Sequence, residues 1–183
     1  MNMVSEILLG AMLLQAPAPT VKTLIDNDRV AVIDATRPAA EPFDAVVVSL
    51  SGSAEFLSKG ASPSIAGRSI VIVLKDHPSV PIENATGYPL AFPRPGSKKI
   101  LENARVVVWD YTWSPGAATP MHFHDKDVVV VYLDDGDLQS TSLDGTVVAN
   151  PHTPGSVTFN RRDRTHTETL IRGKQHAIIT ELK

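Results

Sequence analysis

The stretch from Gly116 to Gly136 constrains this chain most, because it places His122 and His124 one residue apart in a run of strand-forming residues. Side chains alternate between the two faces of a strand, so both imidazoles point to the same side and can hold one ion together. A third histidine, His166, follows a second strand-like run and a polar turn, where an antiparallel strand would bring it opposite the pair. Three imidazoles leave coordination positions open, which is typical of catalytic rather than structural metal sites.

The spacing of these residues resembles the two motifs of the cupin superfamily. The first motif has a Gly, five residues, His-x-His and a later Gly, and residues 116–136 match it. The second has a Gly with a His eleven residues further on, matched by Gly155 and His166. The likeness covers 103–183 and implies an all-β fold, the double-stranded β-helix or jelly-roll barrel, with a metal ion in its mouth.

One ligand of the family's first motif is missing. Val128 and Val129 occupy the two positions where the family carries a metal-binding Glu, and neither side chain can coordinate a metal. Asp127 is one position early and would need a bulge or a register shift to reach the site. We therefore expect a three-histidine site, similar to that of the thiol-dioxygenase type of cupin. Without the carboxylate the ion stays doubly positive, which favours an anionic substrate.

The ligand type leaves the identity of the metal open. Imidazole ligands suit several divalent ions, and we expect Fe(II), with Zn, Ni, Cu or Mn as alternatives. The resemblance implies an Fe(II)-dependent dioxygenase that acts on a small anionic organic molecule. The alternative is a cupin without turnover, serving as a small-ligand-binding or structural protein, since a fold does not by itself give a function.

Three arginines precede the third histidine and are candidates for binding the substrate. Guanidinium groups match the geometry of carboxylates and phosphates, so Arg162 and Arg164 could hold an anion beside the metal. The alternative is a solvated turn in which Arg162 pairs with Asp163 or Glu168.

Aromatic residues share one face of the strand-like run at 105–113. Tyr111 is a further candidate for a substrate pocket, although aromatic side chains on one face more often fill a core. The remaining histidines, His77, His152 and His176, are expected to face solvent.

The sequence of the first half of the chain is similar to that of the second half. The segment NDRVAVIDATRP (27–38) parallels NARVVVWDYTWSP (103–115), and FDAVVVSLSG (43–52) parallels KDVVVVYLDDG (126–136). Between the matched blocks the first copy lacks the segment that carries both histidines. This pattern predicts a repeat that keeps the strands and drops the ligands.

This internal repeat suggests that the chain is divided into two related halves. We expect a degenerate cupin-like half at 20–98 and a complete cupin domain with the metal site at 99–183. The proline-rich segment 76–98 is expected to be a linker along the surface. The alternative is that 20–98 add strands to one barrel, because buried strands favour Val and Ile in any case.

Charge and composition limit the classes of partner. The 183 residues are 43% hydrophobic and 20% charged, which argues for a packed core. A net charge of −3 provides no basic surface for nucleic acid or anionic membranes. The absence of cysteine excludes disulfides and thiolate ligands. The expected partners are a small-molecule ligand and, through the barrel surface, a second copy in a homodimer.

Residues 1–19 contain a short apolar run followed by Ala-Pro-Ala-Pro. This resembles a secretion signal without its basic region, or a short N-terminal helix that docks on the barrel. The first alternative predicts a periplasmic or secreted protein and the second a cytoplasmic one. The run is too short to span a bilayer.

Overall fold

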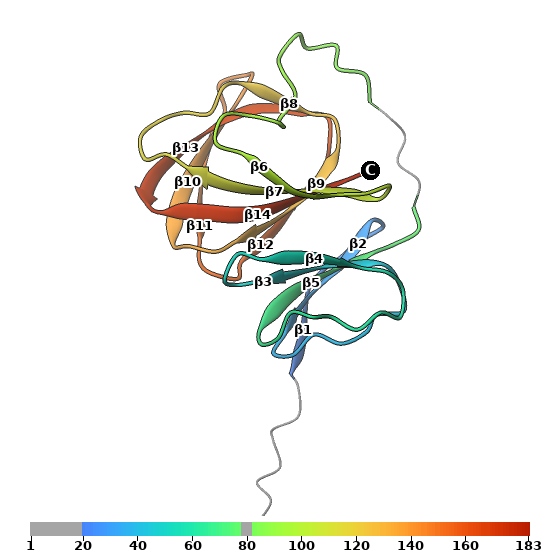
Figure 1. Ribbon diagram of the computed structural model, residues 1–183. Coiled ribbons are helices and arrows are strands. Elements are labelled where there is room, and N and C mark those ends of the chain that lie inside the picture. The colour runs from blue at the N-terminus through green and yellow to red at the C-terminus, as the bar shows by residue number, and fades with distance from the viewer. Residues whose placement is uncertain (1–19, 78–81) are drawn as a thin grey trace, which may run out of the picture.

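The computed structural model describes residues 20–77 and 82–183, and every regular element within these ranges is a β-strand (Figure 1). The all-β prediction is confirmed. In this part of the chain no helix is long and apolar enough to cross a membrane. The segment 1–19, predicted to be signal-like or helical, lies outside the described residues.

The strands form three antiparallel sheets, which we call the N-terminal, histidine and central sheets. The N-terminal sheet has the order β1 (Val21–Asp26), β2 (Val30–Ala35), β5 (Ser69–Leu74), β3 (Ala45–Ser49), β4 (Ala54–Leu57). The histidine sheet has the order β11 (Val147–His152), β10 (Gly136–Ser142), β13 (Arg164–Gly173), β8 (His122–His124). The central sheet has the order β12 (Val157–Asn160), β9 (Asp127–Tyr132), β14 (Gln175–Leu182), β7 (Val106–Trp113), β6 (Lys98–Glu102).

The histidine and central sheets face each other as the barrel, and alternation along the strands decides which side chains fill it. On β7, the side chains at 107, 109, 111 and 113 point into the barrel, and those at 106 and 108 point out. The predicted core role of the aromatic face is confirmed, because Trp109, Tyr111 and Trp113 are all buried there.

The N-terminal sheet covers the outer face of the central sheet, as a separate layer in Figure 1. Valines and isoleucines of β2, β3 and β5 pack against outward-facing residues of β7, β9 and β14 in one buried cluster. The central sheet is therefore buried on both faces, which explains why β9 reads as the uninterrupted apolar run Val128–Val131. The N-terminal strands pair only with one another, so they do not extend the sheets of the barrel.

The N-terminal sheet repeats the central sheet strand by strand. Its order β1-β2-β5-β3-β4 corresponds to β6-β7-β14-β9-β12. Both copies enter their second strand through the same turn, in which Asn27 Oδ1 or Asn103 Oδ1 accepts two backbone N–H groups at 2.8 and 3.0 Å. Within the described ranges nothing in the N-terminal half corresponds to the histidine sheet. These matches support the predicted degenerate half, and the boundaries at 20–98 and 99–183 stay predictions.

The two copies also exchange equivalent ion pairs across their interface. Arg29 of the first copy pairs with Asp127 of the second, and Arg105 of the second pairs with Asp44 of the first, each at 3.3 Å. The aligned positions thus contact each other reciprocally, as they would across a two-fold axis.

The proline-rich segment is exposed at residues 85–90, as expected of a surface linker, but the two residues that follow are not. Ala91 and Phe92 are buried, and Phe92 stacks on Trp109 with ring centroids 5.2 Å apart. The N–H of Ala91 donates to Phe123 O, and the N–H of Phe123 donates to Pro89 O, both at 2.8 Å. The segment therefore lies against β8, and its backbone satisfies both the N–H and the carbonyl group of Phe123.

Candidate metal centre

The structure brings the three predicted histidines together inside the barrel. His122 and His124 lie on β8, and the antiparallel register with β13 places His166 directly opposite His122. All three are buried, and their candidate ligand nitrogens lie within 4.8 Å of one another.

Hydrogen bonds at the far side of two rings orient their Nε2 atoms inward. His122 Nδ1 is 2.8 Å from Pro120 O, and because a carbonyl only accepts, Nδ1 carries the proton and Nε2 keeps its lone pair. His166 Nδ1 is 2.7 Å from Ser140 Oγ. Hydrogen bonds of this kind orient metal-binding imidazoles.

The donor set fits a divalent metal ion. His124 Nε2 and His166 Nε2 are 3.0 Å apart. Two nitrogens at right angles around an ion, each about 2.1 Å from it, would be separated by about 3.0 Å. Burial lowers the pKa of His122, takes that of His124 well below its ordinary value and takes that of His166 to about 4. All three imidazoles are therefore neutral at pH 7, the form that binds metals.

The missing motif carboxylate is explained by how β9 packs. Val128 points into the barrel core and Val129 points toward the N-terminal sheet. Asp127 pairs with Arg29 and accepts the backbone N–H of Arg162 at 2.9 Å. A carboxylate held in this way does not reach the histidines, so the three-histidine donor set has no contribution from β9.

Two charged residues that the sequence did not assign to the metal site lie beside the histidines. Arg94 Nη1 is 3.3 Å from His122 Nε2, and Arg94 Nη2 is 3.3 Å from Glu168 Oε2. Glu168 Oε2 also accepts from Trp113 Nε1 at 3.2 Å. Although burial opposes ionisation, the charge of Arg94 and these donors keep the pKa of Glu168 below its ordinary value.

Of these two residues, only Glu168 could have been placed at the site from the sequence pattern. Glu168 is two residues after His166 on β13, so strand alternation puts it on the same inward face. Arg94 lies in the proline-rich segment, where no periodicity points to the barrel interior.

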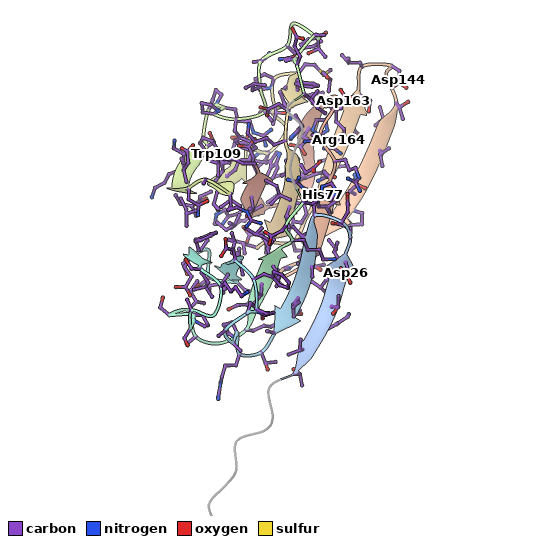
Figure 2. All side chains as sticks on the ribbon, turned by 90° about the vertical axis from the view of Figure 1, so that its right-hand side faces the viewer. Asp26, His77, Trp109, Asp144, Asp163 and Arg164 are labelled. Atoms are coloured by element: carbon purple, nitrogen blue, oxygen red, sulfur yellow. The ribbon has the colours of Figure 1, made fainter. Side chains whose placement is uncertain are left out.

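A polar cavity of about 110 Å³ adjoins His166 inside the barrel. Its lining residues are Tyr132, Leu138, Ser140, Asn150, His152, Thr158, Asn160, Arg164, His166 and Glu168. A more open hollow of about 480 Å³ shares Ser140, Arg164 and His166 with it and is also lined by Asp144 and Asp163 (Figure 2). These three residues therefore border both spaces.

The predicted substrate-binding residues have different surroundings. Arg164 lines the cavity, and its Nη1 donates to Asn160 Oδ1 at 3.1 Å, while its Nε is buried without a hydrogen-bond partner among the described residues. Arg162 lines neither the cavity nor the hollow. Tyr111 is in the barrel core, and the Arg94 guanidinium lies 4.0 Å from the centre of its ring.

The prediction that His152 faces solvent is wrong. Its ring is buried and stacks on Tyr132, with centroids 3.6 Å apart and planes 11° from parallel. The turn-rich sequence around it hid the edge strand β11, whose last residue turns into the cavity. His77 is exposed as predicted, and His176 is half-buried with Nε2 at 2.7 Å from Asp110 Oδ1.

Known proteins resemble about half of the chain or, in one case, most of it. No family model matches the sequence. The β-alanine degradation protein BauB of Pseudomonas aeruginosa is 34% identical over 86 residues, which is 45% of this chain and 87% of that protein. A solved cupin domain from Bordetella pertussis is 26% identical, with a TM-score of 0.44, over 50% of this chain and 97% of that one. A cupin 2 conserved barrel domain protein from Leptotrichia buccalis is 11% identical, with a TM-score of 0.49, over 94% and 92% of the two chains.

The match to BauB extends over most of that protein. Independently of this match, the chain has both histidine motifs and a barrel in which their side chains form one cluster. The chain belongs to the cupin superfamily.

Proposed function

We propose that this cupin binds a divalent metal ion through His122, His124 and His166 and acts as an Fe(II)-dependent dioxygenase on a small anionic organic substrate. The observation that carries the proposal is the convergence of three buried, neutral imidazoles, one of which lines a polar cavity. An iron ion with open positions would supply the redox chemistry, and the protein would supply binding, orientation and exclusion of water.

The charges around the cavity support an anionic substrate. Arg94 and Arg164 bring two positive charges to the barrel interior, and Glu168 brings one negative charge. A buried, incompletely paired cation is costly, and an anion bound at Arg164 would offset that cost. Arg164 lies two residues before His166 on the same face of β13, so the anion would be held beside the metal.

The size of the cavity limits the substrate to a small acid. Since a water molecule takes about 30 Å³ in the liquid, a cavity of about 110 Å³ has room for a few heavy atoms. The name of BauB associates that relative with β-alanine degradation, and small amino acids and related acids are therefore the first compounds to test.

The test is elemental analysis of protein purified anaerobically without chelators, read beside oxygen uptake with a panel of small acids and thiols. We expect near one iron per chain and uptake that depends on the substrate. His122→Ala should lose the metal, whereas the matched control His77→Ala, at an exposed position, should keep it. Equal metal content in both variants would refute the three-histidine site.

A non-catalytic ligand-binding cupin is the second candidate, and one contact favours it. Arg94 donates to His122 Nε2, so a polar group of the metal site is satisfied without an ion. On this alternative, small carboxylates raise the melting temperature of chelator-treated protein, with no oxygen uptake when iron is added.

We also propose that the protein forms a homodimer, and that it is periplasmic or secreted if residues 1–19 are a secretion signal and cytoplasmic otherwise. N-terminal sequencing of the mature chain from its native host tests secretion, and sedimentation of the full chain tests self-association.

A further inference from the structure

We propose that Arg94 couples metal binding to the binding of a small anion in a second, proline-walled cavity, so that each ligand increases the affinity for the other. This inference rests on the proposed metal site and adds an anion site distinct from the cavity at Arg164.

The first step is a competition for one lone pair. Arg94 has only donors, and His122 Nε2 is the acceptor because His122 Nδ1 donates to Pro120 O. A metal ion at the three histidines needs the same lone pair of His122 Nε2. Metal binding must therefore displace the Arg94 hydrogen bond.

The second step is that the Arg94 side chain stays beside the metal site after its hydrogen bond to His122 is displaced. Its side chain is only 6% exposed, and its guanidinium packs over the rings of Phe92 and Tyr111 at 4.7 and 4.0 Å. Its backbone is held by Ser97, whose Oγ accepts from Arg94 N at 3.0 Å and whose N–H donates to Arg94 O at 2.9 Å. The released N–H group remains next to the metal with its charge.

The third step is the balance of charge. A guanidinium keeps its proton in proteins, so a bound dication lies close to a fixed positive charge. Glu168 supplies one negative charge to Arg94 and shares that oxygen with Trp113. The metal and Arg94 together carry three positive charges against this one, so an anion between them lowers the electrostatic energy.

The fourth step is that a space for the anion exists beside both partners. A cavity of about 80 Å³ is lined by His122 and Arg94, with walls of Pro89, Leu90, Pro93, Pro95 and Pro120. Proline offers no N–H donor, so Arg94 is the cationic donor that this cavity presents. At about 30 Å³ per water-sized group, the cavity fits an anion of formate or bicarbonate size. Arg164 lies outside it and lines the other cavity.

The test measures Zn(II) affinity of the full chain, stripped of metal, by calorimetry with and without saturating sodium formate at matched ionic strength. Coupling between two sites is reciprocal and commonly amounts to about 5- to 150-fold. We expect formate to raise the Zn(II) affinity about tenfold, and Zn(II) to raise the formate affinity by the same factor.

Three variants isolate the role of Arg94. Arg94→Met should bind Zn(II) more tightly than the wild type without formate, and formate should no longer change its affinity. Arg94→Lys keeps the charge but loses the planar fork, so it should retain part of the coupling and serves if the methionine variant does not fold. Arg105→Met is the matched control and should retain the full coupling, because Arg105 pairs with Asp44 and lines neither the cavity at Arg164 nor the proline-walled cavity.

The outcomes separate this inference from the proposed function. A wild-type protein that binds no Zn(II) would overturn the metal site itself. Zn(II) binding that formate does not change, or coupling that survives in Arg94→Met, would overturn the role of Arg94 while leaving the metal site intact.

Discussion

The reciprocal ion pairs between the two copies provide a matched test of how burial sets the cost of breaking a charge pair. Arg29 and Asp127 have side-chain exposures of 5% and 2%, whereas Arg105 and Asp44 have exposures of 34% and 27%, at the same distance of 3.3 Å. Removing one partner of a buried pair leaves an uncompensated charge and costs about 3–5 kcal/mol. An exposed pair is worth about 0–1 kcal/mol, because water screens it.

The contacts of Asp127 narrow the expected cost of removing Arg29. Asp127 keeps the backbone N–H of Arg162 at 2.9 Å after Arg29 is lost, so the cost should lie near the lower limit, about 3 kcal/mol. Arg29→Met also removes donors to His77 O and Lys183 O, at 3.0 and 3.3 Å. Arg105→Met should cost about 1 kcal/mol or less.

Thermal unfolding followed by circular dichroism measures the difference. For a chain of this length about 1 kcal/mol shifts the melting temperature by about 2–4 °C, so Arg29→Met should lower it by about 6–12 °C. Arg105→Met should lower it by less than about 4 °C. The double variant Arg29→Met with Asp127→Leu should recover part of the loss, because no unpaired charge remains, although the N–H of Arg162 loses Asp127 as its acceptor. Equal losses in the two single variants would refute the argument from burial.

Three further predictions concern the histidine sheet. Burial takes the pKa of His166 to about 4, below the ordinary value of about 6.5 in an unfolded chain, so the unfolded chain binds the extra proton. The free energy of unfolding of metal-free protein should therefore fall by about 3 kcal/mol as the pH is lowered from about 6.5 to about 4. Urea denaturation at each pH checks this, and a constant stability over that window would contradict it. Ser140→Ala removes the partner of His166 Nδ1 and should weaken metal binding by about 10- to 100-fold in a chelator competition, without loss of the fold. Wild-type affinity in that variant would show that the hydroxyl does not orient the ring. Gly136→Ala places a Cβ 2.3 Å from Lys174 O, a backbone atom that cannot turn away. This variant should lose about 3 kcal/mol, and an unchanged melting temperature would exclude the close contact.

The repeat in the sequence predicted equivalent strands in the two halves. It did not predict that the N-terminal strands form a separate sheet on the outer face of the central sheet. The matched Asn-x-Arg-Val segments predict equivalent turns and strands, and Asn27 and Asn103 make the same hydrogen bonds. Local bonds of this kind depend on neighbouring residues alone. Which charges meet across the interface depends on how two distant copies pack, so the pairing of Arg29 with Asp127 could not be read from either copy.

The candidate site divides in the same way. The sequence by itself determined that His122 and His124 face one side of a strand, that His166 follows at the spacing of a partner strand, and that no carboxylate stands at 128 or 129. These are consequences of alternation with period 2, which acts over a few residues.

Only the tertiary structure decided what surrounds those ligands. Arg94 reaches His122 across 28 residues and Glu168 across 74, from a segment whose prolines indicated a surface linker. His152 is buried because β11 is the edge of the histidine sheet and its last residue faces Tyr132. The physical reason is that closure of the barrel sets these contacts. Closure depends on the summed packing of many distant side chains and leaves no periodic trace in the segments that it brings together.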